Sequence, residues 1–366
     1  MAEIKQILAY LLSVIQIIMP IGAQFIKGED SFFTEWSVTD EFDADDYITI
    51  EKDPEKDFVI LNLADLQLKD NVVYGTEGEY TEVMVEKLIA EKKPDLITLT
   101  GDNAWGTAAY LRLVKMMEAY EIPWAPVMGN HDGQGCANEF WAAYHLSRAE
   151  HCLFEFGPAD MGYGNYIINI TENGRIVHTL FMMDTHNNVS FTDSDGTQIS
   201  GYDGLWDNQI EWYKWAVRGI EKIAGKPVES SVFVHIPLPE YKSAWSAAYS
   251  EDTGSFNPGY ASDSFGEARE GVSCSVQNKG FFDVCKELGS TKNIIAGHDH
   301  VNNFSVEYQG IRLSYALKTG YGAYYDEDMA GSSTLTVNKA GNGVIEHHFV
   351  DKASLEPHSI PLIDIF

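Results

Sequence analysis

Two histidines spaced two residues apart, His298 and His300, are the first residues in this sequence that could do chemistry together. They follow Gly297 and an apolar run at residues 293–296, which is typical of a short buried strand. If the chain stays extended beyond the glycine, alternate side chains point the same way and both imidazoles face one point. Imidazole is a common ligand of divalent transition metals, so this stretch predicts a metal site.

Other apolar runs in the chain also end on residues with oxygen or imidazole donors. These residues are Asp65, Gln67, Asp102, Asn130, His131 and His235. The set holds no thiolate, which favours Mn, Fe or Zn in a reactive site over a structural zinc site. It also exceeds what one ion needs, and two ions about 3.5–4 Å apart that share a carboxylate would use it fully. Such a pair polarises a phosphoryl group and generates a bridging hydroxide.

Short apolar strands alternate with helices in the region that carries the first of these residues. Strands are expected at residues 58–64, 96–100 and 124–128, and helices at 80–91 and 108–120. This alternation predicts an α/β fold. In such sheets ligands bind beyond the carboxyl ends of the strands, which is where Asp65, Asp102 and Asn130 stand.

The rest of the chain is richer in strands. An antiparallel pair is expected at 165–170 and 176–183, joined by a turn that contains Asn173-Gly174. Further helices are expected at 206–223 and 278–288, and further strands at 47–50, 231–234, 304–308, 311–315, 333–337 and 343–350. The polar stretch 239–276 is expected to be a long loop. No linker divides the chain, so we predict a hydrophobic segment and acidic lead-in (1–54), one domain (55–352) and a C-terminal tail (353–366).

Five blocks, D-x-Q, G-D-N, G-N-H-D, V-H-I-P and G-H-D-H, run in this order from Asp65 to His300. Together they resemble the calcineurin-like metallophosphoesterases, a family that includes the purple acid phosphatases. The blocks at 129–132 and 297–300 are highly specific when found together, and the flanks at 233–241 and 297–302 are similar to a single-domain branch related to purple acid phosphatases. The resemblance implies two facing mixed β-sheets flanked by helices.

The resemblance also implies a ligand set for each of two divalent metal ions. The first ion takes two carboxylates, an amide and a histidine, which are Asp65, Gln67, Asp102 and His300. The second ion shares one carboxylate and adds an amide and two histidines, which gives Asp102, Asn130, His235 and His298. Outside the metal shell, His131 would protonate the leaving group, and Asp132 would orient His131.

The chain departs from the family pattern at two positions. The first block usually reads D-x-H, and here Gln67 replaces the histidine. An amide oxygen is a weaker donor than imidazole, so the first ion is expected to be looser, or harder in preference, such as Mn or Mg. Trp105 stands where purple acid phosphatases carry the tyrosine that colours ferric iron, so ferric iron is not implied.

The residues that contact the substrate carry no readable motif. His186 follows a predicted strand, and it either lines the substrate cleft or bonds a neighbour. Three tyrosines follow the last metal block, and they either form a wall of the cleft or cover a sheet edge: Tyr321, Tyr324 and Tyr325. The substrate is expected to be phosphorylated, but the sequence leaves open its identity, the choice between monoester and diester, and the oligomeric state.

The composition limits the kinds of partner that this protein is expected to bind. The formal net charge of −30 argues against a basic groove that binds nucleic acid. Residues 7–23 are mostly apolar, as in a weak signal peptide or an uncleaved anchor, so we favour an exported or membrane-anchored protein over a cytoplasmic one with an ordinary helix there. Among the four cysteines, the pairings 136–152 and 274–285 are possible disulfides.

The expected function is hydrolysis of phosphate esters by a dinuclear metal centre, in which a bridging hydroxide attacks phosphorus and His131 is the general acid. The alternative is a weak or idle module that binds a phosphorylated ligand, because Gln67 impairs one metal site. The presence of His131 argues against this alternative, since binding alone requires no general acid.

Overall fold

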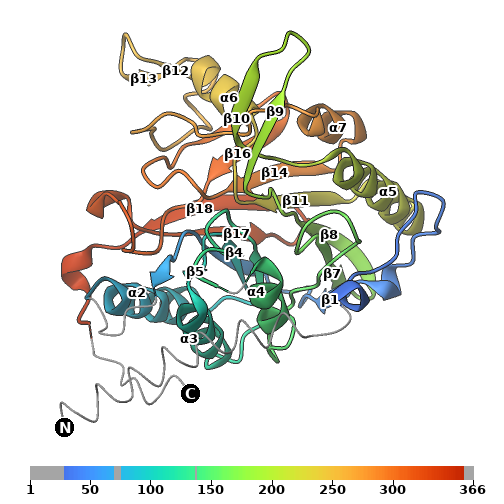
Figure 1. The fold of residues 1–366 in the computed structure, drawn as a ribbon, viewed down its shortest axis with the longest axis horizontal. Helices are drawn as coiled ribbons and strands as arrows, with labels where there is room; N and C mark the ends of the chain where they lie inside the picture. Colours follow the sequence, from blue (N-terminus) through green and yellow to red (C-terminus); the bar gives the residue numbers. More distant parts are fainter. Residues whose placement is uncertain (1–28, 70–75, 137, 358–366) are drawn as a thin grey trace.

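The computed structural model describes residues 29–69, 76–136 and 138–357. The apolar segment at residues 7–23, and with it the prediction of export or anchoring, lies outside the described residues. Within the described part of the chain, no helix has the length and apolar character that a membrane crossing requires. Two main β-sheets with helices on both sides form the body of the protein (Figure 1).

A five-stranded mixed sheet has the strand order β18-β17-β2-β4-β6. Its strands are β2 (Phe58–Leu63), β4 (Leu96–Thr100), β6 (Trp124–Val127), β17 (Gly331–Val337) and β18 (Gly343–Phe349). β2, β4 and β6 run parallel, whereas β17 is antiparallel to both β2 and β18. Every residue of β4 and β6 is buried, which is why these strands are apolar runs without alternation in the sequence.

A seven-stranded mixed sheet has the order β1-β7-β8-β11-β14-β16-β15. Its strands are β1 (Ile48–Glu51), β7 (Tyr166–Glu172), β8 (Arg175–Met182), β11 (Glu229–Val234), β14 (Thr291–Ala296), β15 (Ser305–Tyr308) and β16 (Ile311–Tyr315). β8, β11, β14 and β16 run parallel. The predicted edge strand at 47–50 is confirmed as β1, which pairs with β7 and so places part of the lead-in within this sheet.

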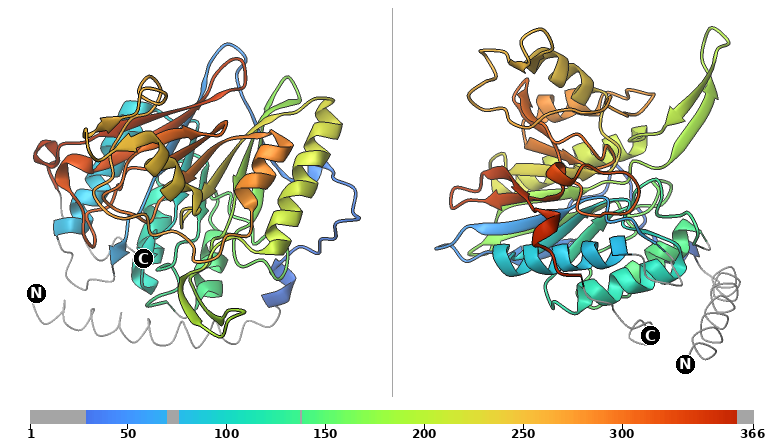
Figure 2. Two further views of the ribbon diagram at one scale, coloured as in Figure 1. Left: turned by 90° about the horizontal axis from the view of Figure 1, so that it is seen from above. Right: turned by 90° about the vertical axis from the view of Figure 1, so that its left-hand side faces the viewer.

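Helices cover the outer face of each sheet (Figure 2). On the side of the five-stranded sheet lie α2 (Thr76–Lys92), α3 (Thr107–Glu118) and α4 (Glu139–Leu146). On the side of the seven-stranded sheet lie α5 (Asp207–Ala224), α6 (Glu240–Ala248) and α7 (Phe281–Leu288). Alternate residues of β8 divide between the two layers: Leu180 and Met182 pack toward the five-stranded sheet, and Phe181 packs with α5. The prediction of two mixed sheets flanked by helices is therefore confirmed.

The prediction of a long loop at 239–276 is wrong in its first part. Residues 240–248 form α6, which buries Tyr241, Ala244 and Ala248, and a small hairpin follows at β12 (Tyr249–Ser250) and β13 (Ser255–Phe256). Serines interrupt α6, so the spacing of its few buried residues is easily missed. The helix α4 and several short elements were not predicted from the sequence. These are β3 (Leu68–Lys69), β5 (Ala104–Trp105), β9 (Asn188–Thr192), β10 (Gln198–Tyr202) and the 3₁₀ helices Glu29–Phe32, Ala44–Asp46, Glu327–Met329 and Lys352–Ser354.

All four cysteines are free thiols, so neither of the two possible disulfides forms. The contacts that hold the two sheets together are instead apolar and hydrogen-bonded. His178 of β8 is one example, because it is fully buried and its Nδ1 donates to the carbonyl oxygen of Gly341, between β17 and β18, at 2.9 Å. Its Nε2 lies 3.0 Å from Oγ of Ser231 on β11.

The burial of His178 predicts that the folded protein loses stability in acid. Burial lowers the pKa of His178 to about 4, whereas the unfolded chain binds the proton near the ordinary value of about 6.5. The neutral His178 therefore makes its full contribution to the free energy of unfolding above pH 6.5. As the pH falls from 6.5 toward 4, this contribution decreases by up to about 1.4 kcal/mol per pH unit. We expect the midpoint of urea unfolding to fall between pH 7 and pH 5. This fall should be larger for the wild type than for His178→Gln. Equal losses in both proteins would contradict the assignment.

Candidate metal centre

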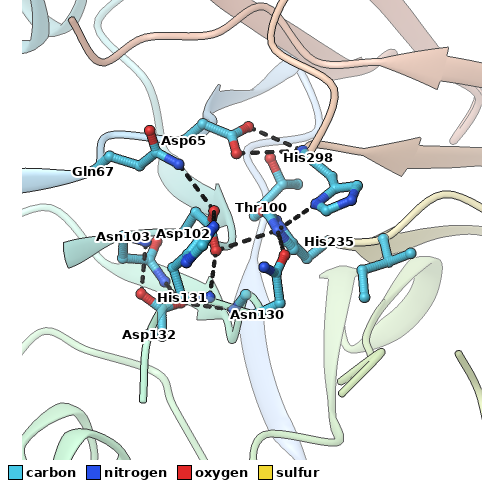
Figure 3. A network of polar contacts seen from close by, with 12 residues as sticks. Asp65, Gln67, Thr100, Asp102, Asn103, Asn130, His131, Asp132, His235 and His298 are labelled. Atoms are coloured by element: carbon cyan, nitrogen blue, oxygen red, sulfur yellow. Dashed lines mark hydrogen bonds and ion pairs between the residues drawn. The ribbon is translucent and has the colours of Figure 1, made fainter. Parts of the chain in front are cut away.

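The seven predicted metal ligands lie together at the carboxyl ends of parallel strands, and Figure 3 labels all of them except His300. They are Asp65 and Gln67 after β2, Asp102 after β4, Asn130 after β6, His235 after β11, and His298 and His300 after β14. All seven are buried, and ligand atoms of Asp65, Asp102 and His235 lie within 4.8 Å of one another. The two sheets thus bring to one place residues that are up to 235 positions apart in the chain.

The backbone at this place is strained. Positive φ angles occur at four of these ligands, which are Asp65 (51°), Gln67 (45°), Asp102 (50°) and His298 (78°). A non-glycine residue in this region typically costs about 1–3 kcal/mol, and such residues concentrate at functional sites. Gly129 allows the close approach of the neighbouring loop, because a Cβ there would lie 2.1 Å from the amide nitrogen of Asp102.

Three donors of the predicted second metal site lie around the fourth, Nε2 of His235. This nitrogen lies 2.9 Å from Asn130 Oδ1, 3.2 Å from His298 Nδ1 and 3.3 Å from Asp102 Oδ1. Around a metal with bonds of about 2.0–2.1 Å, tetrahedral ligands are about 3.3 Å apart. The distances therefore fit a set of donors that share one ion.

Hydrogen bonds hold the ligand histidines in the tautomers that a metal needs. Nδ1 of His235 donates to the backbone oxygen of Thr100 at 2.9 Å, and Nδ1 of His300 donates to the backbone oxygen of Tyr324 at 2.9 Å. Because a carbonyl oxygen only accepts, the neutral form of each ring carries its lone pair on Nε2, facing the cluster. Burial lowers the pKa of His298 to about 3, so this ring is a neutral donor at physiological pH.

The predicted first metal site contains an unexpected lysine. The buried Lys318 donates from Nζ to Gln67 Oε1 at 3.1 Å and to the backbone oxygen of Asp65 at 2.9 Å. Burial lowers the pKa of Lys318 to about 8, and the carboxylates of Asp65 and Asp102 oppose that shift. The ammonium group is therefore the predominant form at neutral pH.

Gln67 consequently turns its amide nitrogen, and not its oxygen, toward the cluster. Nε2 donates to Asp102 Oδ2 at 3.0 Å and lies 3.2 Å from Nε2 of His300. Ligation of the first metal by the amide oxygen of Gln67 stays a prediction, and the observed orientation does not support it, because Lys318 binds that oxygen. The donors of the second site fit a metal ion, whereas those of the first site do not fit one as they stand.

His131 lies beside the cluster and not within it. Its ring stacks on Trp105 with 4.6 Å between ring centroids, and its Nδ1 donates to Gln134 Oε1 at 2.9 Å. Nε2 faces the cluster, 3.9 Å from Asp102 Oδ2, and about a third (32%) of the side chain is exposed. This position suits proton exchange with a group bound over the metal donors.

Asp132 has a different partner from the one predicted. One of its carboxylate oxygens accepts from the backbone N–H groups of Asn103 at 2.7 Å and Ala104 at 3.1 Å. The other accepts from the N–H of Gly129 at 2.7 Å and from the side chain of Asn103 at 2.9 Å. The expectation that Asp132 orients the His131 ring is therefore wrong: Gln134 holds the ring, and Asp132 ties together the loops that carry Asp102 and Asn130.

The family model for the calcineurin-like phosphoesterases matches residues 58–302, which include strands of both sheets and every one of these ligands. The chain belongs to the calcineurin-like phosphoesterase family. The resemblance that the sequence motifs indicated is thereby confirmed.

Relatives within this family include both plant and yeast proteins. "Probable inactive purple acid phosphatase 14" of Arabidopsis thaliana is 29% identical over 268 residues, which cover 67% of this chain and 63% of that protein, a little under two thirds of its length. "Phosphatase DCR2" of Saccharomyces cerevisiae is 30% identical over 239 residues, which cover 61% of this chain and 39% of that protein. Among solved structures, purple acid phosphatase PPD1 from yellow lupin is 13% identical, with a TM-score of 0.43 over 83% of this chain and 53% of that one.

The two candidate substrate residues of this calcineurin-like phosphoesterase, Tyr321 and His186, differ in their surroundings. Tyr321 is buried and its ring packs against Tyr80 and Tyr325, so it lies in the core and not on a cleft wall. His186 stacks on Trp206 at 3.8 Å between ring centroids, and its Nε2 lies 3.0 Å from Gln209 Oε1. His186 thus bonds its neighbours, which was the second of the two interpretations left open.

Two tyrosines lie against histidines of the site. Tyr324, one of the three tyrosines expected either to form a wall of the cleft or to cover a sheet edge, stacks on His300 at 4.2 Å between ring centroids. Tyr202, at the base of the β9–β10 hairpin, was not expected at the site, and it meets the ring of His298 edge to face at 4.3 Å between centroids. Lys318 was not expected there either. Neither Tyr202 nor Lys318 belongs to a motif, so only its position in space marks it.

Proposed function

We propose that this protein is a metal-dependent phosphoric ester hydrolase. The observation that carries the proposal is the convergence of Asn130, His298 and Asp102 within 2.9–3.3 Å of one nitrogen of His235, with His131 at the edge of the cluster. These donors suit a divalent ion of the Mn, Fe or Zn type. Two ions are implied by the family resemblance, and the second of the two sites has the donor geometry for one.

A divalent ion bound by these donors supplies Lewis acidity toward a phosphoryl oxygen and a water of lowered pKa. The chain supplies the rest. Asp102 holds the backbone N–H of His131 at 2.9 Å, which fixes the histidine relative to the metal donors. Gln134 accepts from Nδ1 of His131, so Nε2 of the doubly protonated ring is the nitrogen that would deliver a proton to the departing alkoxide.

A second candidate function is binding of a phosphorylated ligand without turnover. It is favoured by the name of the plant relative, which describes that protein as probably inactive, and by Gln67 in place of histidine. The intact second site and the placement of His131 favour the hydrolase.

One experiment separates the two candidates. The protein is stripped with a chelator, and turnover of a chromogenic phosphate monoester is measured with and without added Mn²⁺. We expect turnover that depends on the metal and returns when it is restored. A folded sample that binds Mn²⁺ and the phosphate ester but never cleaves it would support the binding module. A panel of monoesters, diesters and phosphopeptides then identifies the substrate class.

A further inference from the structure

Lys318 is fixed in place by the backbone around it. Its strand neighbour is Ala64, the residue before Asp65, with which it forms a parallel β-bridge. On the next residue, the N–H of Thr319 donates to the Ala64 oxygen at 2.8 Å and the hydroxyl accepts from the Ala64 N–H at 3.2 Å. The amine therefore enters the first metal site from a rigid position and not from a mobile loop.

This amine dictates which way Gln67 faces. An ammonium group only donates hydrogen bonds, so Gln67 can meet Lys318 only with its oxygen. The amide nitrogen then points at Asp102 Oδ2 and at the lone pair on Nε2 of His300. Those are atoms that a first metal ion would have to bind. Turning the amide to offer its oxygen to a metal would place N–H groups against the ammonium of Lys318.

The position of the amine points the same way. Nζ of Lys318 donates to the backbone oxygen of Asp65 at 2.9 Å and to Gln67 Oε1 at 3.1 Å, so it occupies the side of the cluster where the first ion would bind. A divalent ion there would be repelled by the positive charge of Lys318. Asp102 is the donor of the second site that this pair also reaches, through the hydrogen bond from Gln67 Nε2 at 3.0 Å.

We propose that Lys318 and Gln67 take the place of the first metal, so that the centre binds a single divalent ion tightly, at Asp102, Asn130, His235 and His298. Lys318 then supplies a fixed positive charge next to Gln67, whose amide nitrogen bonds Asp102. This inference rests on the proposed metal-dependent function, and it changes the expected stoichiometry from two ions to one.

The stoichiometry of Mn²⁺ tests it. The chelator-treated full chain is titrated with MnCl₂ by calorimetry, and bound metal is counted by elemental analysis after desalting. We expect one tight equivalent, with any second equivalent at least about tenfold weaker, the lower end of what outer partners of metal ligands are worth. Electron paramagnetic resonance should show the hyperfine pattern of an isolated Mn²⁺ ion. Two equivalents of similar affinity with a spin-coupled spectrum would overturn the proposal.

Variants of Lys318 and Gln67 test whether these two residues prevent tight binding of a second ion. Lys318→Met removes the charge at nearly constant length, and the double variant Gln67→His, Lys318→Met also restores the imidazole of the usual first block. We expect the double variant to gain a second tight equivalent and Lys318→Met to tighten the weak one by about tenfold or more. Lys52→Met is the matched control, because Lys52 is also a buried lysine but pairs with Glu172 at 3.0 Å. A double variant that folds, as judged by circular dichroism, and still binds one equivalent would contradict the proposal.

Failure of the inference is distinguishable from failure of the proposed function. If the wild type binds two ions equally and cleaves phosphate esters, only the role of Lys318 and Gln67 is refuted. If the wild type binds one ion and cleaves no ester, the inference holds and the hydrolase proposal does not. If a variant fails to fold, the wild-type titration and its resonance spectrum still decide the question.

Discussion

Replacing His131 by alanine should lower the turnover of a phosphate ester by about 10²–10⁴-fold, the usual worth of general acid catalysis. The metal content should not change, because the ring stacks on Trp105 and bonds Gln134 outside the set of metal donors. Steady-state kinetics and elemental analysis of the same sample measure the two quantities together.

The dependence on the leaving group shows whether His131 acts as an acid. An aryl phosphate with a leaving group of low pKa needs no proton, so the defect of His131→Ala should shrink for that substrate. Gln134→Ala is a useful companion, since it removes the acceptor at Nδ1 and should cause a smaller loss with the same leaving-group trend. Loss of metal together with activity would instead make His131 a ligand, and an equal defect on all leaving groups would exclude the acid role.

Replacing Asp102 by asparagine should abolish both tight metal binding and turnover. The Asp102 carboxylate lies 3.3 Å from His235 Nε2, and accepts from the N–H of His131 at 2.9 Å and from the Gln67 amide at 3.0 Å. The substitution removes the negative charge and brings in an N–H₂ group that meets other donors. We expect Mn²⁺ affinity to fall by more than about 10²-fold, since partners one step further from a metal are already worth about 10–100-fold.

Asp299 provides the control for this result. It stands between His298 and His300 in the sequence, but its carboxylate accepts from the backbone N–H of Ser273 at 3.0 Å and from the hydroxyl of Tyr315. Asp299→Asn should therefore keep the Mn²⁺ affinity that Asp102→Asn loses. Calorimetric titration of both variants with Mn²⁺ gives the comparison, and full metal binding by Asp102→Asn would place the centre elsewhere.

The sequence by itself was sufficient for the strands of the two main sheets and for the location of the site. Buried strands such as β2, β4 and β14 are apolar runs that stop at polar residues or glycine, so their ends can be read locally. Parallel strands place their carboxyl ends at one edge, which brings Asp65, Asp102 and Asn130 together without any knowledge of side-chain contacts. The same local reasoning failed at α6, where serines dilute the helical pattern of buried residues.

Only the tertiary structure showed which atoms of the site bond one another. Asp132 lies next to His131 in sequence yet bonds the loop at Asn103, and the orientation of Gln67 is set by Lys318, which is 251 residues away. Hydrogen-bond partners depend on positions in space within a few tenths of an ångström, and residue type and spacing do not carry that information. For this reason the sequence predicted a family and its ligand set, whereas only the fold showed that a lysine stands at the first metal site.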